Sequence, residues 1–217
     1  FPTYEATSDL AKQRQYLVAL TQMTYPGAPT IYYGDEIGMV GADDPDDRRA
    51  MEWGKGSKDL VEWYAKLGAI RNAYPVLRTG GIEPFTVMDG TEVDDHLMGY
   101  LRTMNDEFAC VVLNNASEDA IRQIEVPEGA AKVTDVISGK EYIVGADGTC
   151  EVSVPAFRGV VLIPSEQVKE VNVNYEALKP AYDSSYIVED SDVVLVKDIF
   201  EDVQGGEWFG SYVQYVY

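Results

Sequence analysis

A charged loop in the first quarter of the chain combines side chains that can bind hydroxyl groups. Residues 34–56 are rich in Gly and Asp, and within them Asp44 and Arg48 are four positions apart. If Pro45 begins a helical turn, both side chains lie on one face of that turn. A carboxylate accepts hydrogen bonds and a guanidinium donates them through a planar fork, so the pair suits a sugar, whose neighbouring hydroxyls do both. Trp53 lies five positions after Arg48 and offers an aromatic face to the same ligand.

Other interpretations of this loop stay open at the level of the residues. Residues 43–49 could be a solvated charged loop whose acidic and basic side chains pair with each other. A calcium loop is disfavoured because, counting from Asp44, position 6 is Arg49 instead of Gly and position 12 is not Glu. Asp35 and Glu36 are adjacent on an extended turn, so their carboxylates point apart. We interpret them as structural groups, not as an acid–base pair.

The elements around the loop are typical of part of an α/β domain. A helix is expected over residues 8–25, a short strand over 28–33 and a second helix from residue 57 to the stop at Pro75. The strand lacks polar alternation, which indicates burial on both faces, as in a parallel sheet. One such strand cannot close a barrel. Residues 1–80 are therefore expected to be the end of a larger α/β domain.

The apolar period changes to two from residue 81, which predicts an all-β region followed by a linker. Short strands separated by turn signals are typical of an antiparallel β-sandwich, here spanning residues 81–165. Residues 166–197 are acidic and are expected to be a linker, with strand character at 192–196. Residues 198–217 begin a further unit. The predicted strands cover residues 82–88, 96–104, 108–114, 120–126, 132–137, 141–144 and 149–163.

Composition excludes several classes of partner. The net charge is −20, which repels nucleic acid, and no apolar stretch is long enough for a membrane span. Cys110 and Cys150 match no metal spacing and lie in strand-like runs. Buried free thiols are the favoured interpretation, and a disulfide stays open. His96 lies in strand-like sequence away from any nucleophile, so we predict a packed residue instead of a catalytic base.

Two motifs in the first 80 residues resemble a known enzyme family. Residues 24–38, Thr-Tyr-Pro-Gly-Ala-Pro-Thr-Ile-Tyr-Tyr-Gly-Asp-Glu-Ile-Gly, and residues 44–53, Asp-Pro-Asp-Asp-Arg-Arg-Ala-Met-Glu-Trp, resemble the end of the catalytic barrel of the α-amylase family, glycoside hydrolase family 13. The match is nearest to the neopullulanase, cyclomaltodextrinase and maltogenic amylase group. Family members usually carry Pro at the position of Ala50. Residues 135–140 and 154–164 resemble late strands of the family's C-terminal sandwich.

The resemblance implies a fold and a role for the chain. Residues 1–80 would be the C-terminal remnant of a (β/α)8 TIM barrel, comprising its last strand and flanking helices. The family hydrolyses α-glucans with retention through carboxylates on earlier strands, so no catalytic residue is expected in this chain. Asp44 and Arg48 match positions that line donor-side sugar subsites. No cofactor or metal is implied, and the preference for α-1,4 or α-1,6 bonds and the oligomeric state stay open.

Residues 198–217 resemble the start of an S-layer homology module, with Phe200, Asp202 and Val203 followed by Trp208 and Phe209. This resemblance implies an extracellular protein attached to a bacterial cell wall through wall polymers. Two alternatives remain. One is a non-catalytic glycan-binding or anchoring protein, and the other is a family member that transfers or isomerises glucosyl groups.

Overall fold

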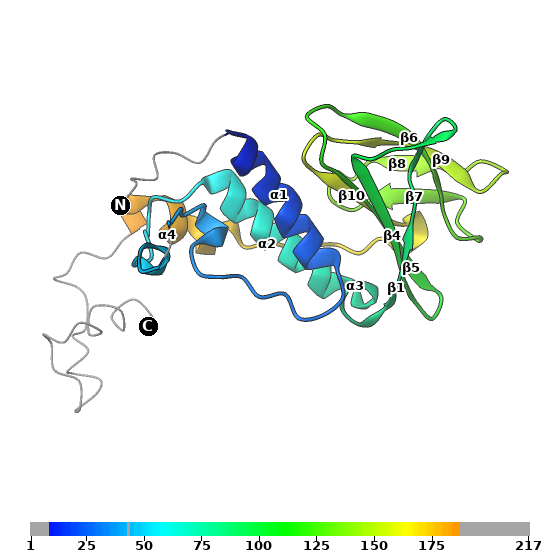
Figure 1. The fold of residues 1–217 in the computed structure, drawn as a ribbon. Helices are drawn as coiled ribbons and strands as arrows, with labels where there is room; N and C mark the ends of the chain where they lie inside the picture. The colour runs from blue at the N-terminus through cyan, green and yellow to red at the C-terminus, as the bar shows by residue number, and fades with distance from the viewer. Residues whose placement is uncertain (1–8, 43, 187–217) are drawn as a thin grey trace, which may run out of the picture.

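Two helices that run in the same direction pack across one face of a β-sheet in the computed structural model, which describes residues 9–42 and 44–186 (Figure 1). The helices are α1 (Asp9–Thr24) and α2 (Lys58–Ala73), and the short α3 (Pro75–Thr79) follows directly. The predicted second helix is confirmed, and Pro75, which the sequence marks as its stop, stands at the first turn of α3. A proline there sacrifices no intrahelical hydrogen bond.

The predicted antiparallel strands are present. The six-stranded sheet has the order β1-β4-β5-β10-β7-β8, and every neighbouring pair is antiparallel. Two further pairs, β6 with β9 and β2 with β3, complete the β region. The strands are β1 (Gly81–Phe85), β2 (Met88–Asp89), β3 (Glu92–Val93), β4 (Leu97–Met104), β5 (Glu107–Asn114), β6 (Ala120–Glu125), β7 (Lys132–Asp135), β8 (Glu141–Ile143), β9 (Thr149–Val154) and β10 (Gly159–Pro164).

Strand β5 has a hydrophobic core on each side, whereas a strand of a two-layer sandwich has a core on one side only. Ala109, Val111 and Leu113 join the helices in one core, whereas Cys110 and Val112 face the β6–β9 pair in the other. Successive side chains of a strand point to opposite faces, so both faces are covered. Helices, central sheet and β6–β9 pair thus form three layers. The boundary predicted at residues 80/81 stays a prediction, and it would cut through the first of these cores.

The strand predicted over residues 28–33 is not formed. This segment is extended but pairs with no strand among the described residues, and Ile31, Tyr32 and Tyr33 are 38%, 50% and 42% exposed. A strand needs a neighbour to satisfy its backbone N–H and C=O groups. The sequence identified an apolar, β-branched segment correctly, but periodicity says nothing about whether that neighbour is available.

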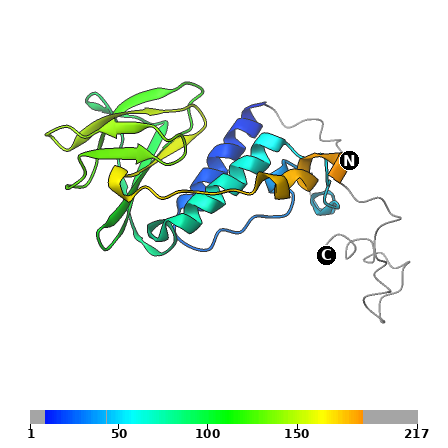
Figure 2. The ribbon, with the colours of Figure 1, turned by 180° about the vertical axis from the view of Figure 1, so that it is seen from behind.

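The beginning of the predicted linker is packed structure. Residues 165–186, which we call the strap, run from the end of β10 along α2 to the loop at the far end of the helices (Figure 2). The amide of Lys169 donates to the Tyr74 hydroxyl at 2.8 Å, and Val171 packs against the helix–sheet core. Turns of three or four residues have no apolar period, so the sequence gives no sign of this packing. The strap contains η3 (Ser165–Gln167), η4 (Tyr175–Leu178), α4 (Lys179–Tyr182) and η5 (Ser184–Tyr186).

Two buried arginines join the helices to the sheet. Arg102 on β4 is fully buried and donates hydrogen bonds to four backbone carbonyls at the ends of α1 and α3 and the start of β1, those of Thr24, Leu77, Gly80 and Gly81. Arg71 on α2 donates to the carbonyls of Met23, Tyr25, Gly27 and Leu77. The last carbonyls of a helix lack intrahelical donors and carry partial negative charge, so a cation satisfies them well. Burial lowers the pKa of both arginines.

Tyr100 gives the fold an alkaline limit. Its hydroxyl shares a buried hydrogen bond with the Thr24 hydroxyl, and burial raises the pKa of Tyr100 to about 12. A raised pKa in the folded state means that the contribution of this group to stability is complete below pH ~10, the unfolded value, and is lost as the pH rises toward 12. We expect the melting temperature to fall more steeply above pH 10 in the wild type than in Tyr100→Phe, measured by calorimetry from pH 8 to 11.5. Equal slopes would contradict this assignment.

The cysteines are buried free thiols, as the sequence favoured. Burial raises the pKa of both thiols, that of Cys150 to about 11. Trp63 is a packing residue as well, with its ring edge-to-face with Tyr16 and its indole N–H donating to the Tyr16 carbonyl at 3.0 Å. His96 is an exception, because it lies exposed in the turn before β4 instead of packed within a strand.

Candidate functional site

The loop between α1 and α2 is held in place by α1, by the strap and by a contact within the loop itself. Gln15 on α1 donates to the carbonyl of Asp35 at 2.6 Å, and Tyr33 donates from its hydroxyl to the carbonyl of Arg49 at 2.8 Å. The amide of Gly56 donates to Ala181 of the strap at 3.0 Å. Within the loop, η1 (Asp35–Ile37) and η2 (Asp46–Arg48) are single turns. A long loop fixed in this way keeps its side chains in a defined arrangement.

Asp44 and Arg48 lie side by side, as their spacing predicts. The Arg48 Nε donates to Asp44 Oδ1 at 2.9 Å, and Nη2 contacts the same oxygen. Hydrogen bonding to Asp44 raises the pKa of Arg48. Both side chains are more than 60% exposed, and such surface pairs contribute little to stability. Among the described residues, Asp44 Oδ2 and Arg48 Nη1 have no partner, so an acceptor and a donor both remain open to solvent.

A second ion pair, which the sequence analysis did not single out, closes the loop. Arg49 holds Asp46 in a bidentate contact, with Nε–Oδ1 at 2.8 Å and Nη2–Oδ2 at 2.7 Å. The amide of Ala42 donates to Asp46 Oδ2 at 2.7 Å and, together with Arg49, lowers the pKa of Asp46. Four aspartates and two arginines within residues 43–49 allow several pairings, and spacing alone does not choose between them. Asp46 and Arg49 thus maintain the loop shape, while Asp44 and Arg48 face outward.

Asp35 and Glu36 belong to the turn and do not form an acid–base pair. The Glu36 carboxylate accepts the amide of Gly34 at 2.9 Å, and the Asp35 carbonyl accepts the amide of Gly38 at 3.1 Å. Gly34 and Gly38 have φ of 98° and 78°, a left-handed region that glycine occupies without strain. The structural interpretation of Glu36 is confirmed.

A small cavity of about 180 Å³ opens beside this turn. Typical small-molecule pockets enclose roughly 300–1,000 Å³, so this cavity is one part of a site and not a complete one. Asp44, Arg48 and Trp53 do not line it, and Trp53 is half-buried next to Gly54, whose amide donates to the carbonyl of Pro180 in the strap. The structure therefore brings Asp44 and Arg48 together outside this cavity, and it does not place Trp53 in the cavity either. Its lining residues are Tyr32, Tyr33, Gly34, Asp35, Met39, Val40, Gly41, Asp46, Asp47 and Arg49.

The described residues include neither a metal-holding group of side chains nor a membrane-spanning helix. No group of three His, Cys, Asp or Glu side chains within residues 9–42 and 44–186 is arranged to hold a metal ion. In the same part of the chain, no helix combines the length and the apolar character that crossing a bilayer requires.

The fold is similar to that of solved α-amylase-type proteins. A solved Anoxybacillus α-amylase superposes with a TM-score of 0.61 and 25% identity, covering 70% of this chain and 32% of that one. A solved cyclomaltodextrinase superposes with a TM-score of 0.61 and 28% identity, covering 72% of this chain and 26% of the other. No family model matches the sequence.

Curated proteins of similar sequence include pullulanases by name. An amylopullulanase from Thermoanaerobacter thermohydrosulfuricus is 37% identical over 166 residues, which are 73% of this chain and 11% of the relative. Neopullulanase 2 from Thermoactinomyces vulgaris is 36% identical over 149 residues, 67% of this chain and 25% of the relative. The chain thus spans a quarter or less of these curated relatives. The similarities support a fragment of a glycoside hydrolase of the α-amylase family, family 13.

Proposed function

We propose that the chain is part of a retaining α-glucan hydrolase that acts on starch-like polysaccharides or maltooligosaccharides. The similarity to amylopullulanases and neopullulanases over two thirds or more of the chain carries this proposal. In it, residues 1–80 complete a TIM barrel whose other strands pair with residues 28–33. The exposure of Ile31, Tyr32 and Tyr33 supports this role, because a packed barrel strand would bury them.

The loop would form one wall of the sugar site, while the catalytic carboxylates belong to the rest of the barrel. Asp44 and Arg48 support this proposal because each keeps an unused polar group at the surface, an acceptor on one and a donor on the other. Trp53 would contribute an aromatic surface nearby. The residues of this chain would then bind and orient the glucan, and the isolated chain would not hydrolyse it.

Replacement of Arg48 tests the role of the loop in the hydrolase. With the chain expressed together with the barrel polypeptide, we expect Arg48→Ala to lower kcat/KM on maltooligosaccharides about tenfold, since a hydrogen bond from a charged donor contributes roughly 1.5–3 kcal/mol and exposure reduces this value. Arg48→Lys should recover only part of the loss, because an ammonium cannot reproduce the planar fork. The exposed Arg78→Ala is the matched control. Unchanged kcat/KM in Arg48→Ala would remove Arg48 from the site.

We also propose attachment of the protein to the outside of a bacterial cell through residues 198–217. This proposal comes from the sequence motif alone, since these residues lie outside those that the structure describes. Purified cell walls should retain the full chain and release it when residues 187–217 are removed. Equal retention of both proteins would argue against it.

A further inference from the structure

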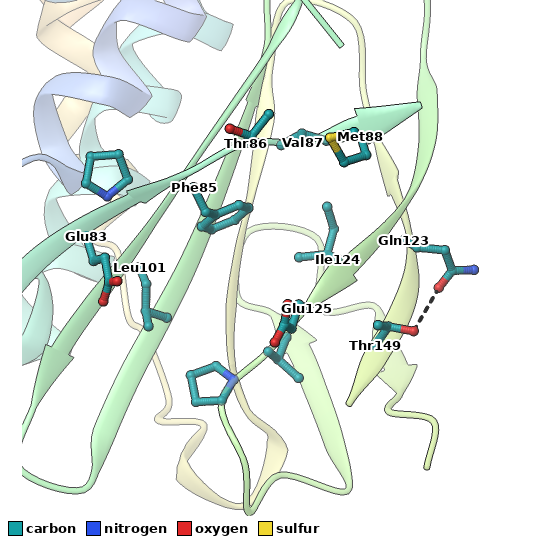
Figure 3. Close-up of a pocket in the computed structure, with 13 residues that line it drawn as sticks. Glu83, Phe85, Thr86, Val87, Met88, Leu101, Gln123, Ile124, Glu125 and Thr149 are labelled. Carbon is teal, nitrogen blue, oxygen red and sulfur yellow. Dashed lines mark hydrogen bonds between the residues drawn. The ribbon is translucent and has the colours of Figure 1, made fainter. Parts of the chain in front are cut away.

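A groove in the β region lies apart from the loop. It opens between the edge of the six-stranded sheet, at β1, and the β6–β9 pair, and encloses about 550 Å³ (Figure 3). None of its lining residues belongs to the loop or to the helices. The groove is lined by the segment from Glu83 to Met88, by Leu101, by the segment from Gln123 to Pro127 and by Thr149.

The ring of Phe85 is fixed in this groove by a glycine on the neighbouring strand. Phe85 pairs with Gly99 in the β1–β4 register, and a Cβ at Gly99 would lie only 2.1 Å from the ring. Gly99 therefore provides the space that the ring occupies, and an aromatic residue over a strand glycine compensates for its missing side chain. The result is an immobilised aromatic surface directed into the groove (Figure 3).

The polar side chains at the edge of the groove are carboxylates, an amide and a hydroxyl, and none of them carries a positive charge. Gln123 and Thr149 are joined by a hydrogen bond of 3.3 Å from Thr149 Oγ1 to Gln123 Oε1, which leaves the Gln123 amide N–H groups available. Glu83 and Glu125 are exposed, and their side chains form no hydrogen bond or ion pair within the described part of the chain. Lys and Arg do not occur in the lining, so the groove disfavours anionic ligands.

We propose that this groove binds a segment of neutral α-glucan at a second site, separate from the loop. A fixed aromatic face contacts the apolar C–H face of a sugar ring, while Glu83, Gln123, Glu125 and Thr149 exchange hydrogen bonds with its hydroxyls. A mainly apolar pocket with a few polar groups is typical of such small-ligand sites. The choice of an α-glucan over another neutral sugar rests on the proposed function. The site would hold the polymer without cleaving it.

Affinity electrophoresis of the 217-residue chain in native gels tests the groove. We expect soluble starch to retard the wild type and dextran not to. Phe85→Leu, which keeps apolar volume but removes the aromatic face, should weaken starch binding at least about fivefold, consistent with roughly 1 kcal/mol for an aromatic contact. Gln123→Ala, on the exposed side of β6, should weaken it as well. Ile143→Ala, at an exposed apolar residue on β8, is the matched control and should bind like the wild type.

The outcomes separate this inference from the proposed function. Retardation that Phe85→Leu and Gln123→Ala weaken and Ile143→Ala does not weaken belongs to the groove, because Phe85 and Gln123 line it and lie outside the loop. Retardation that persists in 0.5 M NaCl supports a neutral ligand, whereas loss in salt would indicate ionic attachment and overturn the proposal. Wild-type mobility unaffected by starch, or equal retardation of the wild type, Phe85→Leu and Gln123→Ala, would also overturn it. Those results leave the kcat/KM test at Arg48 unaffected.

Discussion

Replacing Arg102 with methionine should destabilise the protein by about 3–5 kcal/mol. Methionine has a similar length and no donor, so the carbonyls of Thr24, Gly80 and Gly81 would lose this donor, while that of Leu77 would keep the one from Arg71. A buried polar group left without a partner costs roughly 1–3 kcal/mol, and partial access of water reduces the sum over three groups. Urea unfolding followed by far-UV circular dichroism measures the change in the free energy of unfolding.

Two further variants control this experiment. Arg78→Met removes an exposed guanidinium from α3 and should change the free energy of unfolding by less than about 0.5 kcal/mol. Arg102→Lys retains the charge but cannot reach four carbonyls with one ammonium, so it should fall between the wild type and Arg102→Met. A loss below about 1 kcal/mol in Arg102→Met would show that the junction between helices and sheet does not depend on these hydrogen bonds.

Alanine at Gly56 should detach the strap from the loop. A Cβ at this position would lie 2.7 Å from the carbonyl oxygen of Ala181 and 2.7 Å from Cβ of Ile37. Neither atom is the end of a flexible side chain, so one of the two segments must move. The hydrogen bonds from Gly54 to Pro180 and from Gly56 to Ala181 would break. Overpacking of this kind costs typically 1–3 kcal/mol.

Hydrogen exchange shows where this effect occurs. Gly56→Ala should speed exchange in residues 174–186 and at Gly54, while amides of the central sheet keep their protection. The matched control is Gly68→Ala in α2, where a Cβ meets no atom within 4 Å. It should stabilise the protein slightly, since alanine is favoured over glycine within a helix by about 1 kcal/mol. Unchanged exchange of the strap in Gly56→Ala would mean that the strap does not depend on this contact.

The sequence predicts elements well where the determinants are local. The second helix follows from its apolar spacing and from Pro75, and most strands follow from their alternation and turns. The predicted run 149–163 is divided into β9 and β10 because residues 155–158 form a turn, although the apolar pattern continues across it. The strand predicted over residues 28–33 is wrong because a strand also requires a neighbouring strand to pair with, which the local sequence does not specify.

Long-range polar contacts could not be predicted. Arginine usually lies at the protein surface, so the sequence does not mark Arg71 and Arg102 as buried. Only the folded chain brings seven different carbonyls around them. In the loop, spacing predicts the Asp44–Arg48 pair but not the pair of Asp46 with Arg49, because equivalent charges compete over a few residues. Phe85 gave no sign of a site, since the pairing of Phe85 with Gly99 is a matter of register.

The two-sided burial of β5 restricts how proteins with this fold can exchange segments by recombination. A C-terminal β module transplanted from a related protein would bring its own outer face, which must fit α1 and α2 of the recipient as closely as Val111 and Leu113 do here. Recombination at residue 80 would therefore join mismatched surfaces. Hybrids that fold should therefore take the helices and the sheet from the same parent protein, as one segment that includes both layers.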